Sequence, residues 1–101
     1  ESGTAEGQST EIFARALPPT TQILTVDSDQ MYALYESTAR RLKPWRTVRC
    51  IKGDSVVLFP RLLKALPRHS RALVFVDGPK REDGFQLALH SLSYAPVALA
   101  A

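Results

Sequence analysis

Short apolar runs alternate with helix-length segments along this chain, and this alternation constrains the fold more than any other feature. The runs are too short for helices and rich in β-branched residues, which is typical of buried strands. The predicted strands are residues 23–26, 47–51, 71–76 and 96–99. The predicted helices are residues 9–17, 29–42, 55–66 and 83–92. Because strands joined by helices run parallel through right-handed crossovers, we expect an α/β fold: one parallel sheet with helices on both faces, in three layers.

Apolar residues at helical spacing predict which side of each helix faces the sheet. On the first helix these residues are Ile12, Phe13, Ala16 and Leu17, and on the fourth they are Phe85, Ala88, Leu89 and Leu92. Pro18 and Pro19 end the first helix, because proline lacks the N–H that a helix needs. Pro60 has to lie in the first turn of the third helix or kink it.

Length and composition favour one ordinary globular domain. The chain has 101 residues and a net charge of +3, which does not by itself favour a nucleic-acid partner. The single cysteine, Cys50, cannot form an internal disulfide, so a reducing, cytoplasmic setting is predicted. Since no apolar run approaches the roughly 20 residues of a membrane span, we expect no membrane partner.

Both ends of the sequence fall where strands are expected. Glu1 would be the tip of a strand, and residues 97–101 would lie within another. We therefore expect residues 1–101 to form a partial domain core, truncated at both ends.

The first ten residues predict a strand end, a glycine turn and a helix start. Gly3 and Gly7 can adopt backbone angles closed to other residues and let a ligand approach the main chain. Ser9 or Thr10 would cap the helix, whose free N–H groups favour a ligand carboxylate or phosphate. Glu1 could accept hydrogen bonds from a ligand amino group. A plain structural turn is the alternative interpretation.

An acidic residue stands at the carboxyl end of each successive predicted strand. These residues are Glu1, Asp27, Asp54 and Asp77. Ligands of parallel α/β sheets bind outside the carboxyl ends of the strands, where carboxylates can accept hydrogen bonds from hydroxyls or hold a cation. The alternatives are that Asp27 caps the second helix, that Asp54 only forms a turn and cap, and that residues 77–79 form a plain turn.

Together these motifs resemble the class I S-adenosylmethionine-dependent methyltransferases, which have a Rossmann-like fold. The nearest pattern is that of the small O-methyltransferases such as catechol O-methyltransferase. The residues that carry the resemblance are Glu1, Gly3, Gly7 and Ser9, the strand Leu24-Thr-Val-Asp27, the turn Gly53-Asp54-Ser55, and Phe75-Val-Asp77 with Lys80. The resemblance implies methyl transfer from S-adenosylmethionine to a small-molecule acceptor, with O-methylation favoured.

The resemblance also implies roles for these residues. Glu1, Gly3 and Gly7 would line the methionine part of the cofactor, and Ser9 would contact its carboxylate. Asp27 would accept both ribose hydroxyls, while Asp54 and Ser55 would flank the adenine.

A further pair, Asp77 and Lys80, would act near the transferred methyl group. Asp77 would lie near the sulfonium and, as in the metal-dependent members, ligate Mg²⁺. Lys80 would be the general base. Gly78 and Pro79 depart from the bulkier residues usual in metal-dependent members, whose other metal ligands would lie beyond Ala101. A solvated lysine is the alternative for Lys80.

Three other interpretations stay open. The first is a non-catalytic Rossmann-like binding or assembly module. The second is a nicotinamide-binding domain, which the absence of Gly-x-Gly-x-x-Gly spacing disfavours. The third is RNA binding by a basic cluster near Trp45, for which a solvated helix end is the alternative. This cluster consists of Arg40, Arg41, Lys43, Arg46 and Arg49. The family's first strand lies centrally in the sheet and is missing here, so we expect low stability or self-association through exposed strand edges.

Overall fold

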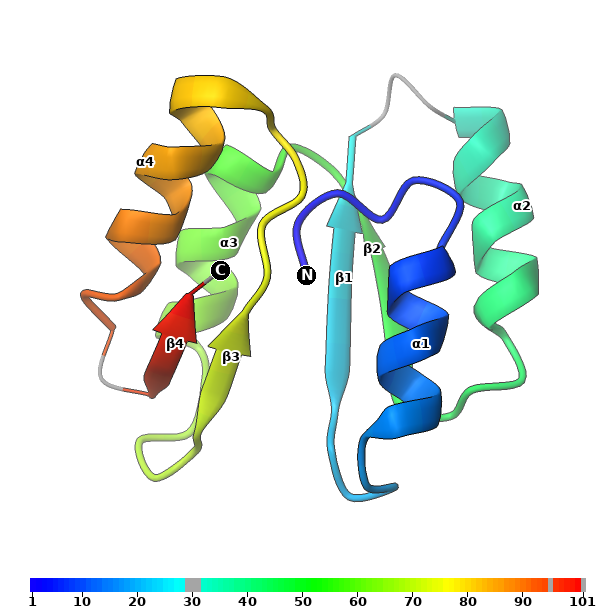
Figure 1. Cartoon of the computed structure of the whole chain (residues 1–101), viewed down its shortest axis with the longest axis horizontal. Coiled ribbons are helices and arrows are strands. Elements are labelled where there is room, and N and C mark those ends of the chain that lie inside the picture. Colours follow the sequence, from blue (N-terminus) through cyan, green and yellow to red (C-terminus); the bar gives the residue numbers. More distant parts are fainter. Residues whose placement is uncertain (29–31, 95, 101) are drawn as a thin grey trace.

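The computed structural model describes residues 1–28, 32–94 and 96–100, and it confirms the α/β class (Figure 1). Helices and strands alternate in the predicted order. The described helices are α1 (Gln8–Ala16), α2 (Tyr32–Leu42), α3 (Ser55–Lys64) and α4 (Arg81–Ser91). The strands are β1 (Ile23–Asp27), β2 (Val48–Lys52), β3 (Ala72–Val74) and β4 (Val97–Ala100). The predicted start of the second helix, residues 29–31, lies outside the described residues.

The start of α1 differs from the prediction that Ser9 or Thr10 caps it. Gly7 is the N-cap residue, with a left-handed backbone (φ 77°) and no side-chain cap. The hydroxyls of Ser9 and Thr10 donate instead to the carboxylate of Glu1. Ser9 and Thr10 therefore lie inside α1, and their side chains bind Glu1, which precedes the helix.

The third helix begins as predicted and contains its proline further along. The Oδ1 of Asp54 accepts from the N–H of Val56 at 2.9 Å, which caps α3. Pro60 lies inside α3 beyond its first turn, so the first-turn position, one of the two predicted options, is wrong.

The strands form two parallel pairs instead of the single predicted sheet. β1 pairs with β2, and β3 pairs with β4. Between the pairs stands Ser2, which forms isolated parallel bridges with Val26 and Val76. β1 and β3 run side by side in Figure 1, but among the described residues they do not pair with each other directly.

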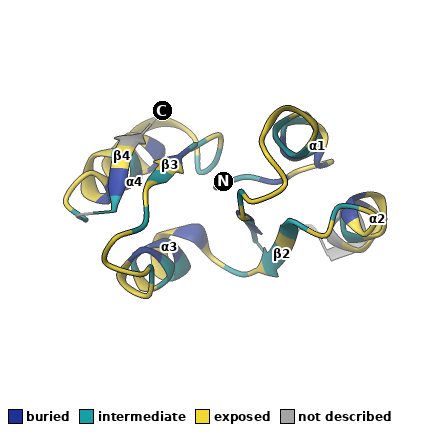
Figure 2. Cartoon of the chain, turned by 90° about the horizontal axis from the view of Figure 1, so that it is seen from below, coloured by how far each residue is buried: buried dark blue, intermediate teal, exposed yellow. Residues whose placement is uncertain are grey.

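The helices lie on different sides of these strands (Figures 1 and 2). α1 packs in front of β1, α3 lies behind it, α2 lies beside β2, and α4 lies beside α3 and β4. The main core forms where α3 and α4 meet the strands. Its buried members are Val26, Phe59, Leu63, Val74, Leu87 and Val97. The described residues include no helix with the length and hydropathy to cross a membrane.

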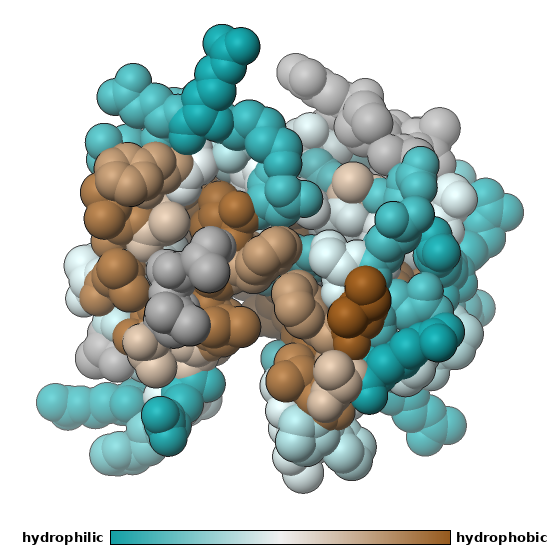
Figure 3. Space-filling view, viewed as in Figure 1, coloured by the Kyte–Doolittle hydropathy of each residue, from teal (hydrophilic) through white to brown (hydrophobic). Residues whose placement is uncertain are grey.

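Two predicted helical faces are wrong in part. On α1, Ile12 is 64% exposed, and on α4, Phe85 is 62% exposed. Leu89 and Leu92 are exposed as well, so the predicted face of α4 lies on the surface. The buried residues of α4 are Gly84, Leu87 and Ser91. Figure 3 shows an apolar surface over the left side of the molecule, where α4, β3 and β4 lie in Figure 1.

Candidate functional site

The main chain of residues 2–5 connects the end of β1 with the segment that follows β3, and the end of β1 contacts the turn after β2. The Ser2 carbonyl accepts from the N–H groups of Asp77 and Gly78 at 2.9 and 3.0 Å. The Ala5 N–H donates to Oδ2 of Asp27 at 2.6 Å. The Asp27 carbonyl in turn accepts from the Gly53 N–H at 2.7 Å. The structure therefore brings together Asp27, the turn before Asp54, and Asp77 around the glycine turn.

Glu1 points its carboxylate into a cluster of protein hydroxyls. Ser9 Oγ donates to it at 2.5 Å and Thr25 Oγ1 at 2.9 Å, and Thr10 donates as well. Thr4 and Thr25 share a further hydroxyl hydrogen bond of 2.6 Å. Much of the acceptor capacity of Glu1 is therefore used within the protein.

The sequence did not indicate Thr4 and Thr25 as members of this cluster, and Thr10 was predicted only as a possible helix cap. Thr10 and Thr25 are fully buried, and Thr4 is nearly so. A polar residue in the middle of the apolar run 23–26 was the available signal, since a buried hydroxyl needs a partner. The partner could not be identified from the sequence because it lies 24 residues away, at Glu1.

Gly3 and Gly7 are both closely packed against protein. A Cβ on Gly3 would lie 2.6 Å from the Gly78 nitrogen, and a Cβ on Gly7 would lie 3.0 Å from Thr38 Cγ2. Both glycines also have positive φ, at 91° and 77°. Their conformation is thus explained by chain packing, and the predicted contact with a cofactor stays a prediction.

Asp27 and Asp54 both hold main-chain N–H groups. Besides Ala5, Asp27 binds the N–H of Ser28 through Oδ1 at 2.8 Å. Each carboxylate oxygen can accept a second hydrogen bond, so Asp27 retains capacity for a ligand hydroxyl. Asp54 is exposed and caps α3, while Ser55 beside it is buried. The cap predicted as the alternative role of Asp54 is therefore present.

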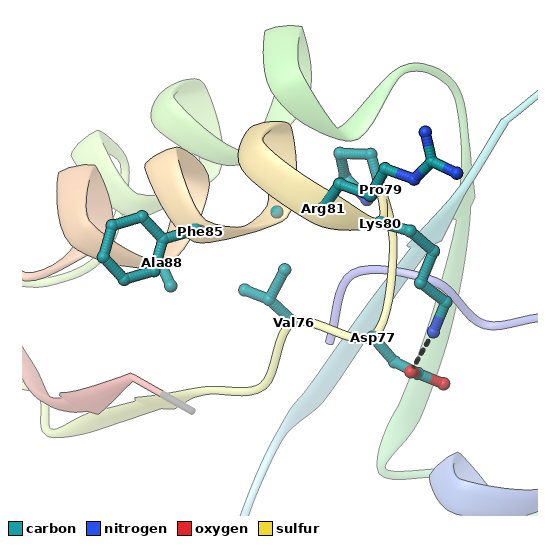
Figure 4. A pocket seen from close by; sticks show the side chains of 8 residues that line it. Val76, Asp77, Pro79, Lys80, Arg81, Phe85 and Ala88 are labelled. Atoms are coloured by element: carbon teal, nitrogen blue, oxygen red, sulfur yellow. Dashed lines mark hydrogen bonds and ion pairs between the residues drawn. The ribbon is translucent and has the colours of Figure 1, made fainter.

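Asp77 and Lys80 form an ion pair at the mouth of an open hollow (Figure 4). Their side chains are 53% and 74% exposed, so the pair lies in water. The hollow has a volume of about 280 Å³ and lies between α4 and the segment 76–80, which follows β3. Val76, Phe85 and Ala88 form its apolar end, and Lys80 reaches away from that end toward Asp77.

The described residues provide few ligands for Mg²⁺. No group of three or more His, Cys, Asp or Glu side chains gathers there in a way that could hold a metal ion. The one predicted ligand, Asp77, is bonded to the Lys80 ammonium through Oδ1. The described residues therefore do not fit a Mg²⁺ site, and its prediction rests on the resemblance alone.

Two further side chains, Cys50 and Trp45, have defined surroundings. Burial, with a smaller contribution from the negative charge of Glu1, raises the pKa of the Cys50 thiol, which is half-buried in β2. The guanidinium of Arg15 lies 5.7 Å from the centroid of the Trp45 ring, a cation–π contact at the end of α1. Trp45, which lies near the basic cluster, thus has an intramolecular partner.

Comparison of the chain with protein-family models, with curated proteins and with solved structures found no match in any of the three.

Proposed function

We propose that this chain is the cofactor-binding core of an S-adenosylmethionine-dependent methyltransferase with a Rossmann-like arrangement. The observation that supports this best is the junction of residues 2–5 with the strand ends at Asp27 and Asp77, to which Gly53 is joined through the Asp27 carbonyl. It gathers the residues to which the resemblance assigns cofactor contacts at one edge of the strands. In parallel α/β folds this edge is where ligands bind.

Asp27 is the residue on which the proposal chiefly depends. Its carboxylate lies at the end of β1 and is held in place by the N–H groups of Ala5 and Ser28. A carboxylate with two further acceptor positions suits the two hydroxyls of a ribose. Asp54 and Ser55 would lie beside the adenine, and Gly3 and Gly7 would shape the turn over the methionine part.

The proposed reaction is direct displacement at the methyl group. S-adenosylmethionine supplies an activated methyl, and the protein supplies alignment. Lys80, as the neutral amine, would take the proton of an acceptor hydroxyl while its oxygen attacks the methyl group and S-adenosylhomocysteine leaves. Asp77 would stabilise the Lys80 ammonium that results, through the ion pair between them. The apolar end of the hollow would accommodate the body of a small acceptor. The proposed reaction needs no metal ion. A cytoplasmic setting belongs to the same proposal.

A second candidate is a non-catalytic Rossmann-like binding or assembly module. It is favoured by the contacts of Glu1, whose carboxylate is occupied by hydroxyls, and by the packing of both turn glycines against protein. Under this interpretation the strand-end acids serve as caps and turn residues, as Asp54 does in α3.

Calorimetric titration of S-adenosylhomocysteine distinguishes the two candidates. We expect micromolar binding to the unaltered chain and at least a tenfold weaker Kd for Asp27→Asn, about 1.4 kcal/mol. Asparagine keeps one acceptor oxygen for the Ala5 N–H but loses the charge and the second acceptor. A parallel titration with Mg²⁺ present measures any metal contribution.

Glu36→Gln is the matched control, because Glu36 is an exposed acid on α2. This variant should bind as the unaltered chain does, and circular dichroism should give equal helix content for all three proteins. Absence of binding by the folded, unaltered chain would exclude the cofactor site and leave the assembly module.

A further inference from the structure

A second hollow lies between α3 and α4, apart from the candidate site. It has a volume of about 300 Å³, at the lower end of the range for small-molecule sites. Its lining residues are Val56 and Pro60 of α3 and Asp83, Gln86, Leu87 and His90 of α4. None of these residues lines the hollow at Asp77, so the two hollows are separate.

The lining residues of the two helices face each other level by level. α3 and α4 lie side by side and run in the same direction (Figures 1 and 2). Val56 is the second residue of α3 and Asp83 is the third residue of α4, so both lie at the same end of the second hollow. Pro60 and Leu87 each follow about one helical turn later. The apolar floor of the second hollow consists of Val56, Pro60 and Leu87.

Pro60 frees a main-chain acceptor in the α3 wall. In an α-helix the carbonyl of residue 56 accepts from the N–H of residue 60, and proline has no N–H. The Val56 carbonyl therefore lacks its α-helical partner. Because helix carbonyls point along the axis toward the next turn, this oxygen lies between Val56 and Pro60, the two residues of α3 that line the second hollow.

The α4 wall provides a carboxylate that the protein does not use. Among the described residues, none forms a hydrogen bond or an ion pair with the side chain of Asp83 or of Gln86. At the other end of the second hollow, the Tyr94 hydroxyl lies 3.4 Å from Nε2 of His90. An ionised carboxylate only accepts hydrogen bonds, as does a carbonyl. Asp83 and the Val56 carbonyl therefore both require a donor, and the Asp83 carboxylate favours a positively charged one.

We propose that the second hollow binds a small organic cation, a primary ammonium attached to an apolar body. An ammonium has three N–H donors and no acceptor, which matches the Asp83 carboxylate and the Val56 carbonyl. The apolar body packs on Val56, Pro60 and Leu87. Because Asp83 is exposed, water and salt weaken its ion pair, so binding is in the millimolar range. The second hollow shares no residue with the proposed cofactor site, and the proposal is independent of that function.

Titration of the full chain with 2-phenylethylammonium, followed by amide chemical shifts in NMR, tests the proposal. The measurement is made at pH 7, where an alkylamine is protonated. The matched ligand is 2-phenylethanol, which has the same apolar body and a hydroxyl donor but no charge. We expect saturable shift changes at the amides of Val56, Gln86 and Leu87 with a millimolar Kd. The alcohol should bind about tenfold more weakly or worse.

Two variants test the two acceptors. Asp83→Asn should weaken binding of the ammonium about tenfold. Glu82→Gln is its matched control, because Glu82 is the neighbouring exposed acid and does not line the second hollow. This control should keep the Kd of the unaltered chain. Pro60→Ala restores the N–H that binds the Val56 carbonyl, so it should weaken binding several-fold without lowering helix content.

Four results would overturn the proposal, provided that circular dichroism shows each protein to be folded. The first is the absence of saturable shift changes at the lining amides of the unaltered chain. The second is equal affinity for the ammonium and the alcohol. The third is equal Kd values for Asp83→Asn and Glu82→Gln, and the fourth is an unchanged Kd for Pro60→Ala.

Discussion

At the scale of single residues, Gly3 is the position with the least room for change. It combines a φ of 91° with a main-chain neighbour, the Gly78 nitrogen, 2.6 Å from where a Cβ would lie. A main-chain atom cannot rotate away as a side chain does. The conformation and the close approach therefore both require glycine.

Gly3→Ala should lower the free energy of unfolding by roughly 2–3 kcal/mol, through backbone strain and a clash with residues 77 and 78. Gly78→Ala is the matched control. A Cβ there would lie 3.4 Å from the Gly3 Cα, an ordinary contact, so the loss should stay below about 1 kcal/mol. Urea denaturation curves of the three proteins measure both effects. Equal shifts of the two midpoints would contradict the importance of this close approach.

In the candidate site, the positions of the acidic residues could be predicted from the sequence, but their hydrogen-bond partners could not. The acids at strand ends were predictable, because short apolar runs locate the strands and parallel strands end at one edge. The partners of those acids were not predictable. Glu1 binds Thr10 and Thr25, and Asp27 binds the main chain of Ala5, contacts that depend on how the turn packs. Local spacing contains no information on such long-range bonds.

At the scale of elements, α4 shows why apolar periodicity chose the wrong face. The buried stripe consists of Gly84, Leu87 and Ser91, spaced as one side of a helix. Two of these residues are small, and they allow close contact. A Cβ on Gly84 would lie 2.1 Å from the Pro79 carbonyl oxygen, and Ser91 Oγ donates to the Leu87 carbonyl at 2.7 Å. Hydrophobicity cannot identify a face that is buried because its residues are small.

An ion-pair network joins α1 to α2 and gives a prediction on pH. Glu11 contacts Arg15 at 3.0 Å and Arg41 of α2 at 3.4 Å. The hydrogen bond from Arg15, helped by the charge of Arg41, lowers the pKa of Glu11 below its ordinary value of 4.5. A lowered pKa in the folded state stabilises the protein above the ordinary pKa, and this contribution disappears as the pH falls through the lowered value.

Glu11→Gln should therefore be less stable than the unaltered chain at pH 7, and the difference should vanish as the pH falls through the lowered pKa of Glu11. Thermal midpoints measured between pH 3 and pH 7 provide the comparison. The exposed Glu36→Gln serves as control. A difference between Glu11→Gln and the unaltered chain that persists unchanged at pH 3 would show that packing, not charge, is responsible.

At the scale of the whole molecule, the sequence predicted the alternation of elements but not the division of the strands into two pairs. The division follows from Ser2, the only described residue that bridges both pairs. The main-chain hydrogen bonds that join the pairs are those of residues 1–3, at one end of the strands. The helix α3 also joins the pairs, since Phe59 and Leu63 share one core cluster with Val26 of one pair and with Val74 and Val97 of the other.

If α3 joins the two strand pairs, removing a core side chain from it should weaken the entire fold. Leu63 is 6% exposed, so Leu63→Ala should reduce the free energy of unfolding by about 2–5 kcal/mol, through lost burial and the cavity left behind. Leu89→Ala is the matched control on α4. Leu89 is 48% exposed, and its loss should change stability by less than about 1 kcal/mol.

Denaturation followed by circular dichroism and by Trp45 fluorescence compares the two variants. Because Trp45 lies near the β1–β2 pair, far along the chain from Leu63, its transition should shift with that of the helices in Leu63→Ala. A shift in the helical signal alone would mean that the two pairs unfold separately and that α3 does not join them.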